Sequence, residues 1–395
     1  AAMKRDQGWW PANMYLEGLD QYRGWFQSAL LTAVGAFGKG APFQECVTHG
    51  WTVDGEGKAM HKSLGNGMDP YEIMDKYGAD LLRLWAASAD YHADVRCSDA
   101  IFKQLSQNYL KFRNTARYCL GNLDGFDPDQ LVAPEEMEEL DRWAVTRLNA
   151  LIEKCAKAYD DYEFLVVTHA VNDFCVVELS NFYLDIIKDR LYCEEADGTK
   201  RRSAQTALFL ILDTMTKIMA PILAFTCDEI WQSMTHRSGD DVRNVVLNEM
   251  NQPFQEYDLG DLVSWGTMIQ LRDGVNAALE AARNEKKIGK SLEAHVSIVT
   301  GEEKPPVDLS DLREHFTQQW WADFFIVSGV DFVTDPTLYS QAAGTPLNGV
   351  RVVVSQAKGE KCERCWMHSP TVGADADHPT LCARCAQVVR KLPQF

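Results

Sequence analysis

Four cysteines near the end of the chain have the spacing of a metal site. Cys362-Glu363-Arg364-Cys365 and Cys382-Ala383-Arg384-Cys385 are two Cys-x-x-Cys pairs separated by sixteen residues. Such thiolates bind Zn²⁺ tetrahedrally, and the metal folds a module whose own core is too small. A thioredoxin-like redox pair would need only one such motif, within a βαβ unit that is absent here. The spacing predicts a structural zinc ribbon held by Cys362, Cys365, Cys382 and Cys385.

A second segment has residue types that suit a polyphosphate. Residues 55–66 read Gly-Glu-Gly-Lys-Ala-Met-His-Lys-Ser-Leu-Gly-Asn. The glycines leave backbone N–H groups accessible, and Lys58, Lys62 and Ser63 add two ammonium groups and a hydroxyl, all of which donate to phosphate oxygens. Glycine and lysine also make ordinary solvated turns. Taken alone, the segment favours a turn, and only the neighbouring residues can favour a phosphate-binding loop instead.

Polar residues follow two predicted strands that precede this loop. A short apolar strand ends at Leu16, and a second one ends near Thr48. Open α/β sheets bind ligands beyond the carboxyl ends of their strands. An isolated Asp20 would more often cap the next helix, and a lone His49 is more often structural. Three polar side chains beside a glycine nevertheless predict a small polar ligand; the residues concerned are Glu17, Gly18, Asp20 and Gln21.

Two helices position these groups. Residues 23–36 carry Trp25, Leu30, Leu31 and Val34 at helical spacing, which predicts that this helix is mostly core. Downstream, Asp69-Pro70-Tyr71-Glu72 is a typical helix start, and Gly78 ends that helix. The loop around Lys62 is therefore expected to lie between a strand and a capped helix, free to close on a ligand.

The middle of the chain predicts an antiparallel helical bundle. After an amphipathic helix over 98–126 and a linker near 126–136, helices are expected over 141–159, 163–191, 203–219 and 221–234. Exposed basic residues on them could contact a polyanion, although most charges on a helix are simply solvated; they include Arg142, Arg147, Lys154, Lys188 and Arg190. A further helix and strand then open a small α/β region that ends near residue 354.

Length and composition limit the class of protein. The 395 residues suggest two to three domains, and 46% hydrophobic with 24% charged residues is ordinary for a globular chain. No apolar run approaches the ~20 residues of a membrane span, and no signal peptide is expected. Eleven cysteines, mostly scattered singly, favour a reducing compartment. The net charge of −18 disfavours nucleic acid, but residues 351–395 hold seven basic and four acidic residues, so the tail has a basic balance.

Several segments, taken in order, resemble the class I isoleucyl-tRNA synthetases. The resemblance covers nearly the whole chain, and the string Asp20-Gln21-Tyr22-Arg23-Gly24-Trp25-Phe26 with the terminal ribbon favours the isoleucine enzyme over its valyl and leucyl relatives. The other matching segments are 15–19, 48–50, 65–66, 78–85, 113–117, 229–231 and 279–283.

The resemblance implies roles for the predicted site. In that family a Lys-Met-Ser-Lys-Ser loop binds the ATP phosphates while the amino-acid carboxylate attacks the α-phosphate, which gives an aminoacyl-adenylate and pyrophosphate. That loop falls on Ala59-Met60-His61-Lys62-Ser63, so Lys62 is the implied catalytic residue. ATP with Mg²⁺ is implied at Lys58, His61, Lys62, Ser63, His49 and Gly50. The aminoacyl-adenylate is implied at Glu17, Gly18, Asp20 and Gln21.

The chain departs from the family pattern in the loop. Ala59 stands where the family has its first lysine, and His61 where it has the central serine. Our hypothesis is that Lys58, His61 and Lys62 together still bind the triphosphate, with His61 adding charge as the pH falls. No covalent nucleophile is needed, because positioning and charge neutralisation carry this reaction.

The family's His-Ile-Gly-His-type signature and inserted editing domain both precede the segment that starts at Tyr15, and neither occurs in this sequence. The chain therefore resembles the C-terminal portion of a synthetase. The missing part is expected as a partner, the sheet edge on the Glu17 side is expected to be exposed, and the fragment is expected to be inactive alone.

The expected fold is α/β followed by mostly α, in five parts. Residues 1–95 form the C-terminal half of a Rossmann-like catalytic domain with the Lys-Ser loop, 96–135 a helical connector of stem-contact type, 136–255 an anticodon-binding helical bundle, 256–354 an α/β junction and 355–395 the zinc ribbon. The implied partners are tRNA(Ile), ATP and isoleucine, without a membrane. The complete protein is expected to be a cytoplasmic monomer. The alternatives are a valyl- or leucyl-tRNA synthetase fragment, or a non-catalytic tRNA-binding module.

Overall fold

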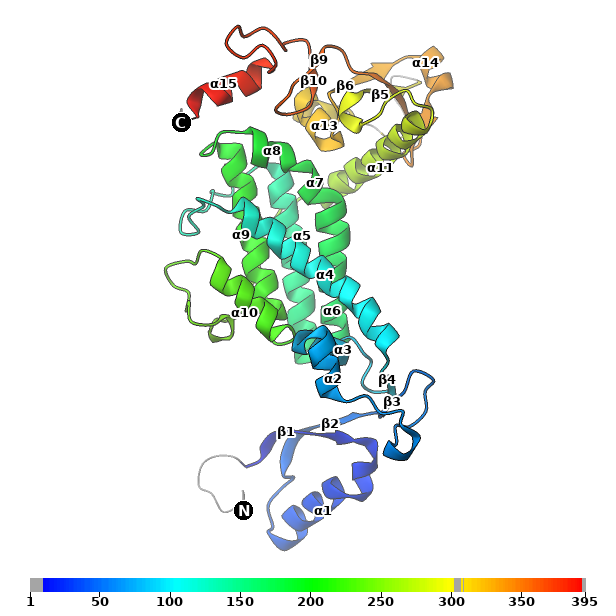
Figure 1. Ribbon diagram of the computed structural model, residues 1–395, viewed down its shortest axis with the longest axis vertical. Helices are drawn as coiled ribbons and strands as arrows, with labels where there is room; N and C mark the ends of the chain where they lie inside the picture. The colour runs from blue at the N-terminus through cyan, green and yellow to red at the C-terminus, as the bar shows by residue number, and fades with distance from the viewer. Residues whose placement is uncertain (1–9, 302–306, 308, 393–395) are drawn as a thin grey trace.

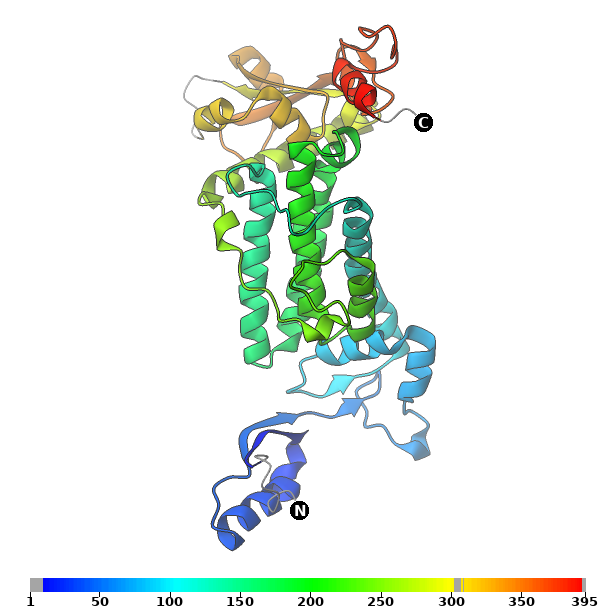
Figure 2. The same ribbon diagram turned by 90° about the vertical axis from the view of Figure 1, so that its left-hand side faces the viewer.

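Three regions follow one another along the longest axis of the molecule. A computed structural model describes residues 10–301, 307 and 309–392. The first strands and helix lie at one end, a helical bundle fills the middle, and a small sheet with the C-terminal tail forms the other end (Figure 1). The same order is seen after a quarter turn (Figure 2). Within the described ranges, no helix has both the length and the apolar character needed to cross a bilayer.

The N-terminal region is a βαβ unit. Strands β1 (Ala12–Gly18) and β2 (Phe43–His49) are parallel, and α1 (Trp25–Leu31) with the π-helical turn Thr32–Ala36 connects them. The ring of Phe26 on α1 lies 5.6 Å from the Tyr15 ring, between ring centroids, and packs α1 on the sheet. The register sets Gly18 opposite His49, so both strands end at the same edge.

The prediction that the helix over 23–36 is mostly core is wrong for one of its faces. Trp25, Leu30, Leu31 and Val34 are between 38% and 64% exposed. Helical periodicity identifies an apolar face of a helix but not the element that covers it. In this chain the β1–β2 sheet packs only against the face of α1 that carries Phe26. Leu16, Leu19, Tyr22, Phe37 and Trp51 are exposed in the same region. The N-terminal unit thus exposes nine large apolar side chains, and contiguous exposed apolar surface marks interaction sites.

Next come the short parallel pair β3 (Thr52–Val53) and β4 (Val95–Arg96), with α2 (Pro70–Tyr77) and α3 (Ala79–Ala87) between them. The predicted cap is confirmed, because the Asp69 carboxylate accepts from the backbone N–H of Tyr71 at 2.9 Å. Gly78, with φ of +88°, ends α2 in a conformation that favours glycine.

Helix α3 joins this region to the bundle through two charged side chains. Buried Asp80 accepts from the Thr226 backbone N–H at 2.7 Å and from its hydroxyl at 2.6 Å, at the first turn of α10 (Ala224–Ser233). Arg83 donates to the backbone oxygens of Ile222 at 2.9 Å and Pro221 at 2.6 Å. One side chain therefore satisfies orphan N–H groups at a helix start, and the other satisfies carbonyls of the preceding turn.

The bundle is antiparallel, as predicted. Its further helices are α4 (Asp99–Asn122), α5 (Glu139–Asp160), α6 (Phe164–Asp173), α7 (Leu184–Ile186), α8 (Lys188–Cys193) and α9 (Thr199–Met219). Helix α9 is central, because every residue from Ser203 to Met219 is buried. The single helix predicted over 163–191 is instead divided: a π-helical stretch, Phe174–Tyr183, follows α6, and the chain breaks again at Ile187 before α8.

A buried carboxylate explains that break. Asp141 on α5 accepts two hydrogen bonds from Arg190 on α8, both at 2.8 Å. It also accepts from the hydroxyls of Tyr183 at 2.8 Å and Ser203 at 2.5 Å. Arg190, expected from the sequence to be an exposed basic residue, therefore serves as the partner of a fully buried acid.

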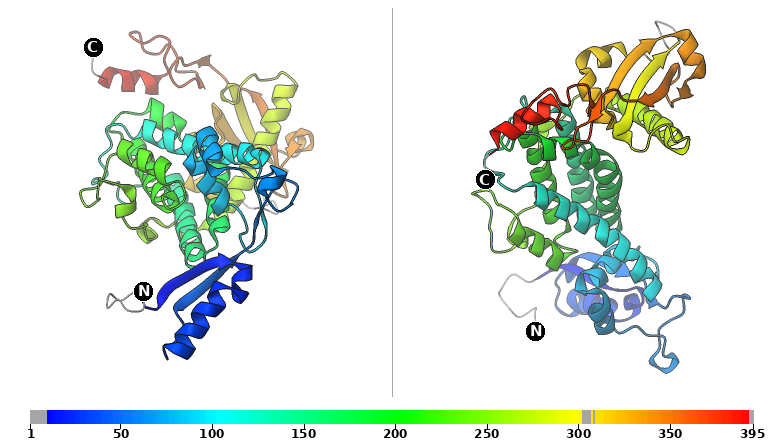
Figure 3. Two further views of the ribbon diagram at one scale, coloured as in Figure 1. Left: turned by 60° about the horizontal axis from the view of Figure 1, so that its bottom comes forward. Right: turned by 45° about the horizontal axis from the view of Figure 1, so that its top comes forward.

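The last region combines a four-stranded sheet with the cysteine-rich tail (Figure 3). The strand order is β6-β5-β8-β7, with β6 parallel and β8 antiparallel to β5. The strands are β5 (Ala294–Thr300), β6 (Gly329–Thr334), β7 (Ala343–Gly344) and β8 (Val350–Gln356), and the helices are α11 (Leu262–Asn284), α12 (Ser310–His315), α13 (Gln318–Phe325) and α14 (Pro336–Gln341). The tail adds β9 (Glu360–Lys361), β10 (His368–Ser369) and α15 (Ala383–Lys391). The predicted fold class, α/β followed by mostly α with a partial Rossmann-like unit, is confirmed.

Replacing Asp141 with alanine should destabilise the bundle by about 3–5 kcal/mol, the cost of leaving one member of a buried ion pair without its partner. The Arg190 side chain that loses its acceptor is only 12% exposed. Urea unfolding followed by circular dichroism measures the loss. The matched control is Glu153→Ala on the exposed side of α5, which should change the stability by less than about 0.5 kcal/mol. Equal midpoints for the two variants would contradict the prediction.

Candidate functional site

The carboxyl edge of the β1–β2 sheet gathers part of the predicted site. A Cβ built on Gly18 would lie 3.0 Å from Asp20 Oδ1 and 3.9 Å from His49 Cε1, so the three residues share this edge. His49 Nδ1 donates to the Gly50 carbonyl at 2.7 Å. A Cβ on Gly50 would lie 2.3 Å from the Ala93 oxygen, so only glycine fits there.

Two of the predicted adenylate-binding residues differ in what surrounds them. Gln21 Oε1 accepts from the Trp25 backbone N–H at 2.9 Å and so caps α1. Asp20, for which a cap was the simpler interpretation, makes no such hydrogen bond among the described residues, and its side chain is exposed, as is that of Glu17. The acidic pair is therefore open to a ligand, whereas Gln21 already has a structural role.

The segment predicted to bind phosphate, residues 55–66, is closed at its base by the side chains of Asp54 and Asn66. The Asp54 carboxylate accepts from the Lys58 backbone N–H at 2.8 Å and from the Asn66 amide at 2.8 Å. These bonds, the Asn66 bond foremost, lower the pKa of Asp54. Asn66 in turn accepts from the His61 backbone N–H at 2.9 Å and donates to the Ala59 carbonyl at 3.1 Å. We call this arrangement the Asp54–Asn66 latch.

Above the latch, the functional groups of the loop face solvent. His61 and Ser63 are exposed, and Lys58 makes a 2.7 Å ion pair with Glu56 in which both side chains are at least 70% exposed. Lys62 opens a short 3-10 turn, Lys62–Leu64, and its side chain lies outside what the structure describes. Among the described residues, no hydrogen bond joins this loop to the sheet edge, so the two parts of the predicted site are not closed on one another.

A cavity of about 500 Å³ lies between the β1–β2 sheet and the base of the bundle. Leu16, Val47 and His49 line it from the sheet, and Tyr159 lines it from α5. Arg83 also reaches it, but its guanidinium already donates to the backbone of the α9–α10 turn. The lining is mainly apolar, which suits a packed partner better than a phosphate.

The tail brings its four cysteines together. Cys362, Cys365, Cys382 and Cys385 are buried, and their sulfur atoms all lie within 4.8 Å of one another. Tetrahedral Zn–S bonds of about 2.3 Å would separate sulfurs by about 3.8 Å, and the Sγ atoms of Cys365 and Cys382 are 3.9 Å apart. The Cys382 backbone N–H donates to Cys362 Sγ at 3.3 Å, as at a thiolate ligand. The residues fit Zn²⁺, which would stabilise the tail without taking part in a reaction.

Sequence reasoning missed the residues that hold these parts in place. Asp54 and Asn66 flank the lysines, but glycine and lysine dominated the interpretation of the segment. Asp80 and Arg83 lie in a segment that the sequence marks only by its resemblance to the family, and their partners are 138–146 residues away. No local spacing signals contacts of that separation.

Three family models match the chain in the order of its structure. Residues 2–98 match the class I tRNA synthetases of the I, L, M and V group, 141–298 match the anticodon-binding domain of tRNA ligases, and 359–388 match a zinc finger found in FPG and IleRS. The three models together indicate a class I aminoacyl-tRNA synthetase chain.

Whole-sequence comparison gives the particular family. The isoleucine–tRNA ligase of Caldanaerobacter subterraneus is 48% identical over 391 residues, which cover 97% of this chain and 40% of that protein. The isoleucine–tRNA ligase of a Thermoanaerobacter species is 46% identical over 98% of this chain and 41% of that protein. A solved Mycobacterium tuberculosis methionyl-tRNA synthetase with methionyl-adenylate has 19% identity and a TM-score of 0.49, over 57% of this chain and 44% of that one. The chain belongs to the isoleucyl-tRNA synthetase family, and it spans about two fifths of the length of these curated relatives.

Breaking the latch should loosen the loop. In Asp54→Ala, the backbone N–H groups of Lys58 and Glu56 lose their acceptor, and Asn66 loses one of its own. We expect amide hydrogen exchange across residues 56–61 to rise by roughly three- to tenfold. The matched control is Glu56→Gln, which removes only the exposed ion pair with Lys58 and should leave exchange unchanged. The latch has no role if both variants exchange at the wild-type rate.

Proposed function

We propose that this chain is the part of an ATP-dependent isoleucine–tRNA ligase that carries the phosphate loop, the anticodon-binding bundle and the zinc ribbon. The observation that carries the proposal is 48% identity to a protein named isoleucine–tRNA ligase over nearly the whole chain. The matching order of synthetase, anticodon-binding and zinc-finger models supports it. The complete protein would activate isoleucine with ATP and transfer it to tRNA(Ile).

The proposed chemistry is positioning and charge neutralisation. Lys62 and Ser63, with Lys58 and His61 beside them, bind the triphosphate of Mg²⁺-ATP as the loop closes over the sheet edge. His49 and Gly50 border the nucleotide. The negative charge of the α-phosphate rises as the carboxylate attacks, and the ammonium of Lys62 neutralises it without a proton transfer.

The amino-acid side of the site is the exposed acidic pair. Glu17 and Asp20 lie at the carboxyl edge beside Gly18, where their carboxylates can accept from the ammonium group of an amino acid and from the ribose of the adenylate. Gln21 contributes through α1, whose first turn it caps. Gly18 leaves room for close approach, since even a Cβ there would press on Asp20.

The remaining parts are assigned to tRNA. We infer that residues 96–135 contact the stem, that 136–255 bind the anticodon arm, and that 256–354 and 355–395 extend this surface. Residues 351–395 contain seven basic and four acidic residues, and this excess of positive charge supports the assignment to tRNA. We place the protein in the cytoplasm, where its free cysteines stay reduced, and expect the complete enzyme to act as a monomer.

The complete protein needs a second part of the catalytic fold. The curated relatives are about two and a half times as long as the matched span, and the exposed apolar side chains of the N-terminal unit require a cover. We propose that the segments of a full-length relative that lie outside this span pack on β1 and on the outer face of α1. Alone, the chain would bind tRNA but not form an adenylate.

Lys62→Ala in the full-length protein should slow isoleucine-dependent ATP–pyrophosphate exchange by roughly a hundredfold or more, as expected for loss of a donor to the transition-state charge. His61→Ala should cost less than about tenfold. Ala59→Lys, which restores the family's first lysine, serves as the gain-side control and should not slow exchange. Equal and negligible losses in the two alanine variants would refute the assigned role of the loop.

Substrate choice separates the proposal from its rivals. The full-length protein should support pyrophosphate exchange with isoleucine well above valine and leucine; the reverse order would indicate a valyl or leucyl enzyme. If the chain is instead a non-catalytic module, tRNA binding that weakens steeply with salt should persist while exchange is absent with all three amino acids. Ala59 is the residue that favours this second reading, and the retained Lys62 opposes it.

A further inference from the structure

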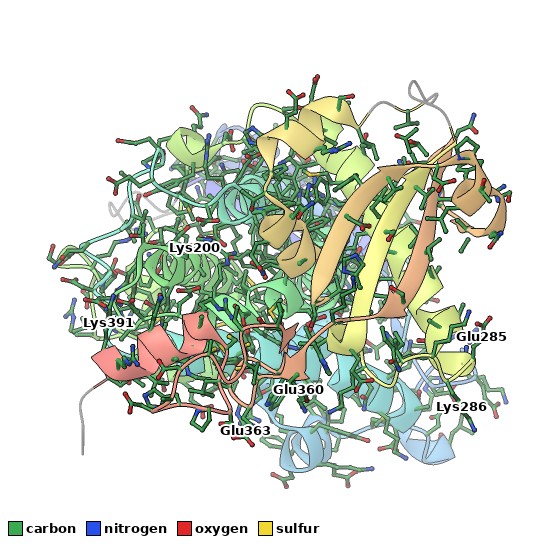
Figure 4. All side chains as sticks on the ribbon, turned by 90° about the horizontal axis from the view of Figure 1, so that it is seen from above. Lys200, Glu285, Lys286, Glu360, Glu363 and Lys391 are labelled. Carbon is green, nitrogen blue, oxygen red and sulfur yellow. The ribbon has the colours of Figure 1, made fainter. Side chains whose placement is uncertain are left out.

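The zinc ribbon rests on one short helix of the bundle. Arg384 donates to both carboxylate oxygens of Asp189 on α8, at 2.5 and 2.7 Å. Lys391 makes a 2.7 Å ion pair with Glu195, just beyond the end of that helix. Seen from above, α15 with Lys391 lies across the end of the bundle (Figure 4). The ribbon is thus held on α8 by several charged contacts.

Arg364 ties a metal ligand to the end of the same helix. Its guanidinium donates to the backbone oxygens of Cys193 at 2.5 Å and Tyr192 at 3.4 Å, the last residues of α8. The same Nη1 lies 3.8 Å from the sulfur of Cys385, within the range of an N–H···S contact. A cation is favourable at a helix C-terminus and equally favourable beside a thiolate. The guanidinium of Arg364 contacts the carbonyl groups at the end of α8 and the sulfur of Cys385 at the same time.

A fifth thiol adjoins the four-cysteine site. Cys193 is 5% exposed, packs in one cluster with the four cysteines, and its thiol donates to the Arg364 backbone oxygen at 3.7 Å. It is not in the set of sulfurs that lie mutually within 4.8 Å, so it is a neighbour of the ligands and not one of them. This cysteine comes from the bundle, 169 or more residues before the ligands.

Charge explains why a metal site would use these neighbours. Zn²⁺ with four thiolates carries a net negative charge, and burial makes such a charge costly unless donors surround the sulfurs. Arg364 is aimed at Cys385, and the guanidinium of Arg384 is fixed nearby by Asp189. Groups that hydrogen-bond to metal ligands typically change metal affinity 10–100-fold when they are removed.

We propose that the C-terminal end of α8 is part of the outer shell of the zinc site: Arg364, held by the α8 carbonyls and by the thiol of Cys193, stabilises the coordinated Cys385 thiolate, so that zinc retention and the placement of Arg364 on α8 are coupled. The coupling is reciprocal. The end of α8 that holds Arg364 beside Cys385 slows zinc loss, and zinc in the ribbon keeps Arg364 aligned with α8.

Zinc release from the loaded full chain to a chromophoric chelator tests the proposal. Cys193→Ala and Arg364→Lys should each release zinc about 10–100-fold faster than the parent chain, and Cys193→Ser, which keeps a donor, should release it close to the parent rate. Two controls should leave release unchanged. Cys46→Ala removes an exposed cysteine in β2, and Glu195→Gln removes a ribbon contact that touches no ligand.

Circular dichroism of the bundle helices checks that each variant is folded. If Cys193→Ala does not fold, the zinc release rate of Arg364→Lys alone tests the proposal. Release at the parent rate in Arg364→Lys overturns the proposal. So does equal acceleration in Glu195→Gln, because the contacts would then act only by holding the ribbon in place. As a second readout, removal of zinc from the parent chain should speed hydrogen exchange at the end of α8, and unchanged exchange there would also overturn the coupling.

Discussion

The buried carboxylate of Asp141 is the interaction on which the middle of the molecule depends. It joins α5 to α8 through Arg190, to the π-helical stretch through Tyr183 and to α9 through Ser203. A buried charge is tolerated only when its acceptor sites are filled, and here four donors fill them. The break before α8 follows from this network, because Arg190 must turn inward to reach the acid. That turn also presents the other side of α8, with Asp189 and the final carbonyls, to the ribbon.

The two ends of the bundle are joined to their neighbours by the same physical means. At one end, Asp80 and Arg83 satisfy backbone groups around the start of α10; at the other, Arg364 satisfies carbonyls at the end of α8. Charged side chains on orphan helix-terminal groups fix an orientation that apolar packing alone would leave loose. Between these junctions runs α9, whose 21 residues span about 32 Å at 1.5 Å per residue. The separation of the phosphate loop from the ribbon is therefore set by rigid helices and not by linkers.

The spacing of residues along the sequence predicted the features that depend on contacts between near neighbours. The Asp69 cap, the helical periods of the bundle and the cysteine pairs all follow from neighbours within a few residues, and the structure agrees with them. Three predictions failed where the deciding partner was distant or absent. The outer face of α1 around Leu31 is apolar but exposed, the Arg190 side chain is charged but only 12% exposed, and the helix over 163–191 is periodic but broken. For Gln21 the sequence predicted a ligand contact. The structure shows that its side chain also caps α1, a role that the sequence alone does not indicate. The latch and both junctions depend on pairs that only the fold brings together.

The altered loop can be reconciled with phosphate binding through its own geometry. Ala59 cannot supply the family's first ammonium group, but its carbonyl is held by Asn66, so the backbone here is fixed although the side chain is small. Lys58, one position earlier, is paired with Glu56 at the surface, and an exposed pair of this kind is worth little. A triphosphate with its bound Mg²⁺ offers Lys58 a much higher charge density than one solvated carboxylate. Under the proposed function, the loop would exchange its internal ion pair for a phosphate contact at small cost while the Asp54–Asn66 latch keeps its base in place. If so, the exposed ammonium group of Lys58 replaces the one that the family's first lysine would supply at position 59.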